Sequence, residues 1–132
     1  MASPRLIVGH RDPGFVVDVQ AAIESLRALA PNWDSYGAPA IDPDVIEAAK
    51  AFIAKLPENV AFRPLIVPMS NGTLQLEWHD GPKSLELEFE SPDSIRYLQR
   101  HPDRGVEKED SFSVTDVDTA VDLIRWMVGA RE

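Results

Sequence analysis

The chain has 132 residues, no cysteine and a net charge of −9 at pH 7, from 13 basic and 22 acidic side chains. The lack of cysteine excludes disulfides, thiol nucleophiles and thiolate metal sites. The acidic balance argues against direct nucleic-acid binding, which depends on basic residues. The length fits a single domain over residues 1–132 with one core, and the charge is typical of a protein that is merely well solvated, or of one that meets a basic protein surface.

No stretch of the sequence predicts a membrane or export segment. None approaches the roughly 20 apolar residues that span a bilayer, and the run Leu6-Ile7-Val8 is too short for a signal peptide. We therefore expect a cytoplasmic protein that binds no membrane.

Three segments carry apolar residues at helical spacing. The first covers about residues 16–30, with a buried stripe of Val19, Ile23, Leu26 and Ala30. The second begins at Asp42-Pro43, an N-cap followed by proline, and turns inward Val45, Ile46, Ala49, Phe52, Ile53 and Leu56. The third begins at Thr115, which forms a capping-box pattern with Asp118, and turns inward Val117, Ala120, Val121, Ile124 and Met127.

Apolar and polar residues alternate over residues 65–98, which predicts an antiparallel meander with one apolar face. Asn71-Gly72 is expected to form a two-residue hairpin loop, which sets three apolar pairs on that face: Leu65 with Trp78, Val67 with Leu76, and Met69 with Leu74. Pro64 and Pro68 restrict this first strand to an edge of the sheet, because proline cannot donate to a ladder.

The turn Asp80-Gly81-Pro82-Lys83 continues the same alternation. It sets three apolar pairs inward: Trp78 with Leu85, Leu76 with Leu87, and Leu74 with Phe89. The outward pairs are Glu77 with Glu86 and Gln75 with Glu88, so the carboxylates on the outward side repel one another. A fourth strand is expected over residues 94–99, with Arg96 outward beside Glu88.

Residues 101–110 are polar and rich in turn formers, so we expect a loop there, followed by a short strand at residues 111–114. Together the segments predict an α+β two-layer domain. It has an antiparallel meander of four strands, or five if residues 111–114 pair, with three helices on one face and the other face open.

No catalytic motif is present, since the chain lacks a G-x-S-x-G elbow, a Walker loop and a G-x-G-x-x-G fingerprint. One cluster is expected on the outer face: Glu77, His79, Glu86 and Glu88. Such a group either belongs to an ordinary solvated face or holds a divalent ion in a small metal-dependent enzyme or metal-binding domain. We favour the solvated face, with no catalytic residue, metal or cofactor, because flat sheet faces seldom enclose an ion.

The loop between the first two helices, residues 31–41, contains Trp33, Asp34 and Tyr36. Aromatic residues on a rigid loop are typical binding anchors. The alternative, which we favour, is that Trp33 and Tyr36 pack into the core while Asp34 accepts backbone hydrogen bonds in a turn.

Several segments together resemble a group of small bacterial proteins that has no assigned activity. They are an N-W-D-x-Y-G-A loop at residues 32–38, the following Pro39-Ala40-Ile41, Leu56-Pro57 at a helix end, and a G-x-L-Q-L-E-W strand within residues 71–78. The resemblance covers about residues 26–90. It implies a bacterial or mobile-element setting and transfers no catalytic residue, cofactor or substrate.

The leading hypothesis is a noncatalytic acidic interaction module, such as an antitoxin, an immunity protein or a phage-encoded inhibitor. Its partner would present a basic surface, on which the carboxylates could imitate nucleic-acid phosphates. The candidate contacts are Glu77, Glu86, Glu88, Glu90, Trp33, Asp34 and Tyr36. A homodimer formed by edge pairing or helix packing is a further alternative, since the acidic face would repel its own copy.

Overall fold

The computed structural model describes residues 14–60 and 62–128. Five strands form one antiparallel sheet in chain order: β1 (Leu65–Pro68), β2 (Leu74–Asp80), β3 (Lys83–Phe89), β4 (Ser94–His101) and β5 (Val106–Ser113). The α-helices are α1 (Phe15–Ser25), α2 (Pro43–Lys55) and α3 (Val117–Val128), and short 3₁₀ turns occur at Leu26–Ala28, Glu58–Val60 and Pro102–Arg104. This is the α+β architecture that the sequence predicts.

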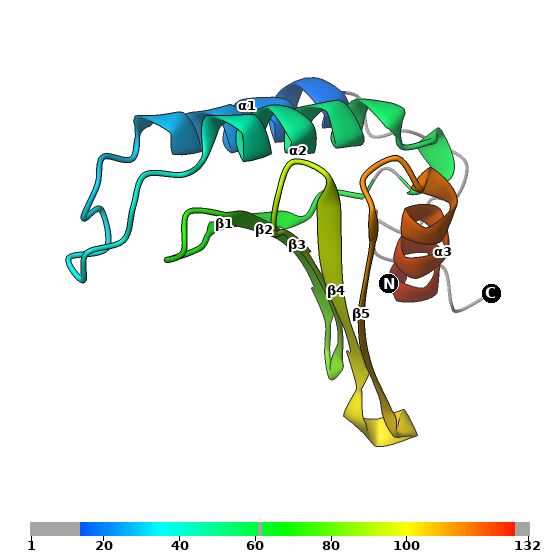
Figure 1. Cartoon of the computed structure of the whole chain (residues 1–132). Coiled ribbons are helices and arrows are strands. Elements are labelled where there is room, and N and C mark those ends of the chain that lie inside the picture. Colours follow the sequence, from blue (N-terminus) through cyan, green and yellow to red (C-terminus); the bar gives the residue numbers. More distant parts are fainter. Residues whose placement is uncertain (1–13, 61, 129–132) are drawn as a thin grey trace.

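The helices cover one face of the sheet and leave the other open (Figure 1). α1 and α2 lie side by side across one end of the sheet, and α3 packs against β2 and β3. The inward side chains of β2 and β3 are fully buried, among them Leu74, Leu76, Leu85, Leu87 and Phe89. Phe52 of α2 meets Phe89 edge to face, with ring centroids 5.4 Å apart. Within residues 14–60 and 62–128, no helix is long and apolar enough to cross a membrane.

The start of α2 is the predicted one. The carboxylate of Asp42 accepts a hydrogen bond from the N–H of Asp44 at 2.9 Å, and Pro43 takes the first helical position. α1 is shorter than predicted, because it ends at Ser25 and gives way to a 3₁₀ turn. Ala30, expected on its buried stripe, is exposed.

The N-cap of α3 is Asp116 and not the predicted Thr115. Oδ1 of Asp116 accepts a hydrogen bond from the N–H of Thr119 at 3.2 Å. The N–H of Thr115 donates to the hydroxyl oxygen of Ser113 at 3.1 Å, in the turn before the helix. Aspartate is the stronger N-cap of the two adjacent residues, which is why the helix begins one residue later.

The pairings of β2, β3 and β4 confirm the predicted alternation. Asp80 pairs with Lys83 around Gly81-Pro82, and every predicted β2–β3 pair occurs, including Glu77 opposite Glu86. β4 then sets Ile95 and Tyr97 inward and Arg96 outward, opposite Glu88. The outer side of these strands is therefore the acidic side.

The pairing of β1 with β2 differs by one residue from the prediction. Leu65 lies opposite Glu77, and Ile66 lies opposite Leu76. Ile66 therefore packs against the core, whereas Leu65 and Val67 lie on the open face, where Leu65 is 61% exposed. A shift of one residue moves every side chain of a strand to the other face. β1 is at the edge of the sheet, as predicted.

The cause of the shift is the turn before β2. The N–H of Gly72 donates to the carbonyl of Met69 at 3.0 Å, and the N–H of Met69 donates to the carbonyl of Thr73 at 2.9 Å. Gly72 has a left-handed φ of 91°, whereas Asn71 does not have a positive φ. A two-residue type I′ loop needs positive φ at both central residues, so the chain instead forms a longer turn with a glycine bulge.

The prediction of a loop at residues 101–110 is wrong. After the 3₁₀ turn Pro102–Arg104, β5 pairs with β4 along its whole length, from Val106 opposite His101 to Ser113 opposite Ser94. The predicted strand at residues 111–114 is only the last part of β5. Most side chains of this edge strand are exposed, so no alternation of apolar and polar residues marks it in the sequence.

Candidate functional site

The open face collects carboxylates from three strands. Alternate residues of β2 to β5 project from it. Its acidic residues are Glu77, Glu86, Glu88, Glu107 and Glu109, and Arg96 and Arg100 of β4 lie between them. Glu90 follows β3 directly. The four glutamates predicted to bind a partner therefore come from β2 and from the region of β3.

Glu77 is held by two side chains of its own strand. Its Oε1 lies 3.0 Å from Nε2 of His79, and its Oε2 accepts a hydrogen bond from the amide of Gln75. The side chain of Glu77 is only 18% exposed, and Gln75 is buried. Gln75 and Glu77 thus lie against the sheet, whereas His79, the last residue of this outward row, is exposed.

Glu86 lies directly opposite Glu77 in the middle of the face. Partial burial raises the pKa of Glu86 above its ordinary value, and the charge of Glu77 raises it further, against the opposing charges of His79 and Arg100. Within the described part of the chain, no side chain forms a hydrogen bond or an ion pair with the Glu86 carboxylate. Glu86 is therefore a carboxylate without a cation bound to it.

Glu88 and Glu90 are oriented by hydroxyl groups. Oε2 of Glu88 accepts a hydrogen bond from Oγ1 of Thr73 at 2.9 Å. Oε2 of Glu90 accepts hydrogen bonds from the hydroxyls of Ser94 at 2.9 Å and Ser111 at 3.2 Å. These contacts fix the direction of both carboxylates without neutralising their charge.

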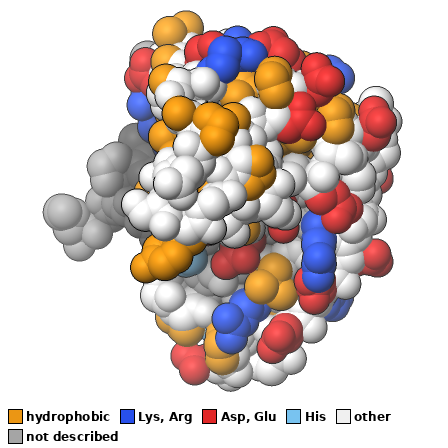
Figure 2. Space-filling view, turned by 60° about the vertical axis from the view of Figure 1, so that its left-hand side comes forward, with side chains coloured by type: hydrophobic (Ala, Val, Ile, Leu, Met, Phe, Trp, Pro, Cys, Tyr) orange, Lys and Arg blue, Asp and Glu red, His pale blue; other side chains and the backbone are white. Residues whose placement is uncertain are grey.

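Arg96 lies opposite Glu88, but its guanidinium group binds Glu109 of β5, with Nε 2.8 Å from the carboxylate. The space-filling view shows acidic side chains separated by basic and hydrophobic ones, without one continuous acidic patch (Figure 2). The acidic residues of β5 are thus partly neutralised within the chain, whereas the centre of the face at Glu86 is not.

Apolar side chains also lie on this face, because of the shifted register of β1. Leu65 is exposed beside Glu77, and Val67 lies opposite Gln75. Leu98 of β4 lies opposite Glu86 and is half-buried. The face therefore offers apolar area next to its carboxylates, a combination that the alternation of the sequence did not predict.

The metal alternative has no support in the structure. Glu77 and His79 are in contact, but across the described ranges no group of three His, Asp or Glu side chains could hold a metal ion. Glu86 lies on the neighbouring strand and does not complete such a group.

The loop at residues 31–41 is braced by its own side chains. Nε1 of Trp33 donates to the carbonyl of Pro39 at 2.9 Å, and its ring packs partly against the core. Oδ1 of Asp34 accepts hydrogen bonds from the N–H groups of Tyr36 at 2.9 Å and Ala38 at 3.1 Å. These bonds lower the pKa of Asp34 below its ordinary value, and they confirm its predicted role in a turn.

The prediction that Tyr36 packs into the core is wrong, since its side chain is 91% exposed. Asn32 and Ser35 both have a left-handed φ of 67°, which turns the chain back on itself and directs Tyr36 outward. A large aromatic side chain is thus displayed on a loop that is fixed on both sides of it.

This loop contacts the turn between β1 and β2. The N–H of Asp42 donates to the carbonyl of Gly72 at 2.8 Å. A Cβ atom at Gly72 would lie 3.3 Å from the carbonyl oxygen of Ala40, so glycine permits the close approach. Asn71 of the same turn donates to Glu88 at 3.4 Å. The turn therefore connects the loop that carries Tyr36 with the open face.

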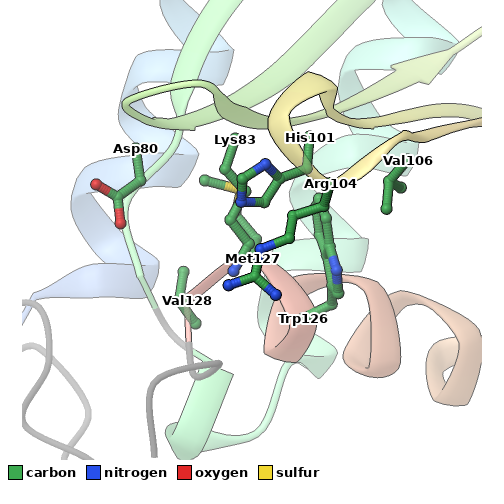
Figure 3. A pocket seen from close by; sticks show the side chains of 8 residues that line it. All are labelled: Asp80, Lys83, His101, Arg104, Val106, Trp126, Met127 and Val128. Carbon is green, nitrogen blue, oxygen red and sulfur yellow. The ribbon is translucent and has the colours of Figure 1, made fainter.

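A cavity of about 520 Å³ lies on the helix-covered side, where the β2–β3 and β4–β5 turns meet α3 (Figure 3). It is lined by Asp80, Lys83, His101, Arg104, Val106, Trp126, Met127 and Val128. The sequence did not reveal this cavity, because the pairing of β4 with β5 forms it and residues 101–110 carry no strand pattern. The sequence feature that could have indicated the cavity is Trp126, an aromatic residue off the main apolar stripe of its helix.

No known protein family, curated protein or solved structure matches the chain. The resemblance of residues 26–90 to small bacterial proteins therefore stays a prediction. No residue role is carried over from another protein, and function rests on the contacts described above.

Proposed function

We propose that the protein is a noncatalytic binding module whose open sheet face holds the basic surface of a partner protein. The observation that carries this proposal is Glu86, which lies opposite Glu77, has a raised pKa and has no partner in the described residues. Like charges directly opposite each other destabilise a sheet. A lysine or arginine of the partner placed at Glu86 would remove that repulsion, so the complex gains an interaction that the free chain lacks.

The acidic residues of the helical side support this proposal by contrast. Glu24 of α1 binds Arg27 and Lys50, and these hydrogen bonds lower the pKa of Glu24 to about 2. Glu47 of α2 also binds Arg27. Glu24 and Glu47 thus have cations bound to them, whereas Glu86 has none within the described residues. This difference supports a role for Glu86 in binding a cation of a partner.

An apolar side chain next to the carboxylates, and an aromatic one on the loop that contacts the β1–β2 turn, suit a protein partner. Leu65 is exposed beside Glu77, and Tyr36 is exposed on the braced loop. Exposed aromatic residues on rigid loops often supply much of a binding energy, while charges steer the approach. Leu65, Tyr36 and the carboxylates together fit a partner surface that is basic and also contains apolar pockets.

This chemistry fits an antitoxin, an immunity protein or a phage-encoded inhibitor that acts in the cytoplasm and covers a basic functional surface. The partner would be a nuclease or another protein that binds nucleic acid, because such proteins display the required cations. A second copy of this chain is a poor occupant, since it would set Glu77 and Glu86 against the same two carboxylates.

The test compares charge reversals on two surfaces. Proteins from a bacterial lysate are captured on the immobilised full chain, on Glu86→Lys/Glu88→Lys and on Glu58→Lys/Asp122→Lys, and the recovered partner is then purified for affinity measurements. The two double variants change net charge equally, but the second changes exposed residues outside the sheet face. We expect to recover one basic protein in a stoichiometric amount. Its binding should weaken as the salt concentration rises and should be lost only with Glu86→Lys/Glu88→Lys.

Equal loss with both double variants would show that only net charge matters and would contradict a defined face. Binding that survives Glu86→Lys/Glu88→Lys would also contradict it. With the purified partner, carboxyl NMR should show the pKa of Glu86 falling on binding, because a cation of the partner favours the ionised form. An unchanged pKa of Glu86 would show that the partner does not bind at Glu86 and would contradict the proposal.

A further inference from the structure

The outer edge of β5 leaves main-chain groups unpaired. Among the residues that the structure describes, β5 is the last strand of the sheet and pairs with β4 alone. It lies at the margin of the sheet (Figure 1), and every side chain from residue 107 to residue 111 is exposed. An unpaired strand edge of this kind can accept an extended segment of another chain as a further strand.

The ladder with β4 determines which main-chain groups point outward. The N–H of Val114 donates to the carbonyl of Asp93 at 3.0 Å, one position beyond the last pair of the ladder. In an antiparallel ladder, such a bond means that the two residues of that last pair do not bond each other, and the same holds at every second pair. Glu107, Glu109 and Ser111 therefore direct their N–H and C=O groups away from β4.

Two of these outward donors are open. In the described part of the chain, no group accepts a hydrogen bond from the N–H of Glu107 or of Glu109. The N–H of Ser111 donates to Oδ1 of Asp110 at 2.8 Å. This carboxylate oxygen occupies the place that a carbonyl of an added strand would take.

Three carboxylates line the open-face side of this edge. Glu107 and Glu109 project there from alternate positions of β5. Glu90 extends the row by two residues, because its Oε2 accepts a hydrogen bond from the hydroxyl of Ser111 at 3.2 Å. Glu109 is bound by Arg96, but within residues 14–60 and 62–128 no cation is bound to Glu107 or Glu90. Since opposite charges stabilise cross-strand pairs, the row favours a strand with cations at alternate positions.

We propose that the partner of the open face adds an extended segment to the outer edge of β5, with lysine or arginine at alternate positions. This assignment rests on the proposed function, because it concerns the same basic partner. The main chain of the segment pairs with Glu107 and Glu109, and one of its carbonyls displaces Asp110 at Ser111. Its cations meet the three carboxylates of the row, on the same side of the sheet as Glu86.

The test uses three synthetic peptides of equal length. They are acetyl-Lys-Val-Lys-Thr-Lys-Val-Lys-amide, the same peptide with N-methyl-lysine at every lysine, and a counterpart with glutamate at every lysine. In an antiparallel pair, a lysine opposite Glu107 or Glu109 directs its own N–H toward β5. N-methylation therefore removes the donors needed for pairing and keeps the charge.

Binding to the full chain is followed by ¹H–¹⁵N NMR and by hydrogen exchange of single amides. With saturating lysine peptide, the amides of Glu107 and Glu109 should exchange at least about tenfold more slowly, because each gains a carbonyl partner. The amide of Lys108 already faces β4 and should change less. The N-methylated peptide should bind at least about tenfold more weakly, and the acidic peptide should not bind.

A pair of variants tests the same edge from the side of the protein. Glu107→Pro removes an outward N–H and no bond to β4, and proline is tolerated at such edge positions. Glu107→Gln loses the same charge and keeps the donor. We expect Glu107→Pro to weaken the lysine peptide at least about tenfold more than Glu107→Gln does. The ¹H–¹⁵N spectrum shows whether each variant keeps the fold, and the N-methylated peptide tests the pairing on the unchanged protein.

Several results would overturn the added strand. Equal affinity of the lysine peptide and its N-methylated form would show attraction by charge alone. Slow exchange at Glu107 and Glu109 without peptide, increasing with protein concentration, would assign the edge to a second copy of the chain. Binding that shifts Glu86 without slowing either amide, or no binding at millimolar concentration, would also contradict it. These results leave the proposed function standing, because the capture experiment with Glu86→Lys/Glu88→Lys decides that function separately.

Discussion

The two faces of the sheet are held by different forces. On the helix-covered side, Trp78 and Phe89 are buried in the core. On the open side, Glu77 and Glu88, their direct neighbours in sequence, are held by hydrogen bonds to polar side chains. Adjacent residues of one strand thus stabilise the fold by unrelated means, through buried area on one face and through charge and hydrogen bonding on the other. Substitutions at neighbouring positions can separate the two.

Phe89→Ala should have the largest effect. Its ring is fully buried against Phe52, and its loss should lower the free energy of unfolding by about 3–5 kcal/mol. Glu88→Ala is the matched control on the same strand and should cost less than about 1.5 kcal/mol, because it removes only surface hydrogen bonds. Urea denaturation measures both values. Similar losses would contradict the division between the faces.

Trp78→Phe should have the second largest effect. The indole N–H donates to the carbonyl of Phe62 at 2.9 Å, and removing the donor in this buried place should cost about 1–3 kcal/mol. Trp33→Phe removes an equivalent bond to Pro39 at an exposed site, where water can replace the donor. Thermal or urea unfolding should therefore show a clearly smaller loss for Trp33→Phe, and the reverse order would be evidence against this account.

Glu86→Gln should stabilise the free protein, by roughly 0.2–1 kcal/mol at pH 7. The raised pKa of Glu86 means that the folded state holds the proton more tightly than the unfolded state. Ionisation therefore weakens the fold as pH rises from the ordinary glutamate pKa through the raised value. The gain in Glu86→Gln should be full above that window and vanish below it, as measured by unfolding at several pH values.

Glu107→Gln is the control for this prediction. Glu107 lies opposite Arg100 on the same face, so its charge has a favourable neighbour. Its neutralisation should not stabilise the protein at pH 7. If both variants gained stability equally, the net charge of the chain and not the Glu77–Glu86 pair would be responsible.

Tyr36→Ser should have the smallest effect on stability, within about 0.5 kcal/mol, because the side chain is exposed. The same change should weaken the binding of the proposed partner by about 2 kcal/mol if Tyr36 is an anchor. Calorimetry with the purified partner and denaturation of the free variant give the two values. A marked loss of stability with unchanged affinity would assign Tyr36 to the loop and not to the interface.

The alternation of residues was sufficient to predict β2 and β3, because both strands have one fully buried face. It failed at β1, where the register depends on whether Asn71 adopts a positive φ, a choice made by hydrogen bonds at Met69 and Thr73. It also failed at β5, which is held by main-chain bonds to β4 and has little side-chain burial. Burial leaves a pattern in a sequence, and backbone pairing at an edge does not.

The same limits apply to the candidate sites. Glu77 opposite Glu86 follows from strand parity and could be predicted. The exposure of Leu65 follows from the register of β1 and could not. The cavity needs His101, Arg104 and Trp126, which meet only after β4, β5 and α3 have packed, so no local pattern of the sequence indicates it.

The two edges of the sheet also have a consequence for how molecules of this protein behave toward one another. An unpaired strand is a template on which another chain can add a strand. β1 is short and ends in Pro68, whereas β5 runs for eight residues and carries the charges Glu107-Lys108-Glu109-Asp110. Three of these four side chains are acidic, so a second copy of β5 placed beside this edge meets a net electrostatic repulsion. The two edges are therefore protected in different ways, the short edge at β1 by proline and the long edge at β5 by charge.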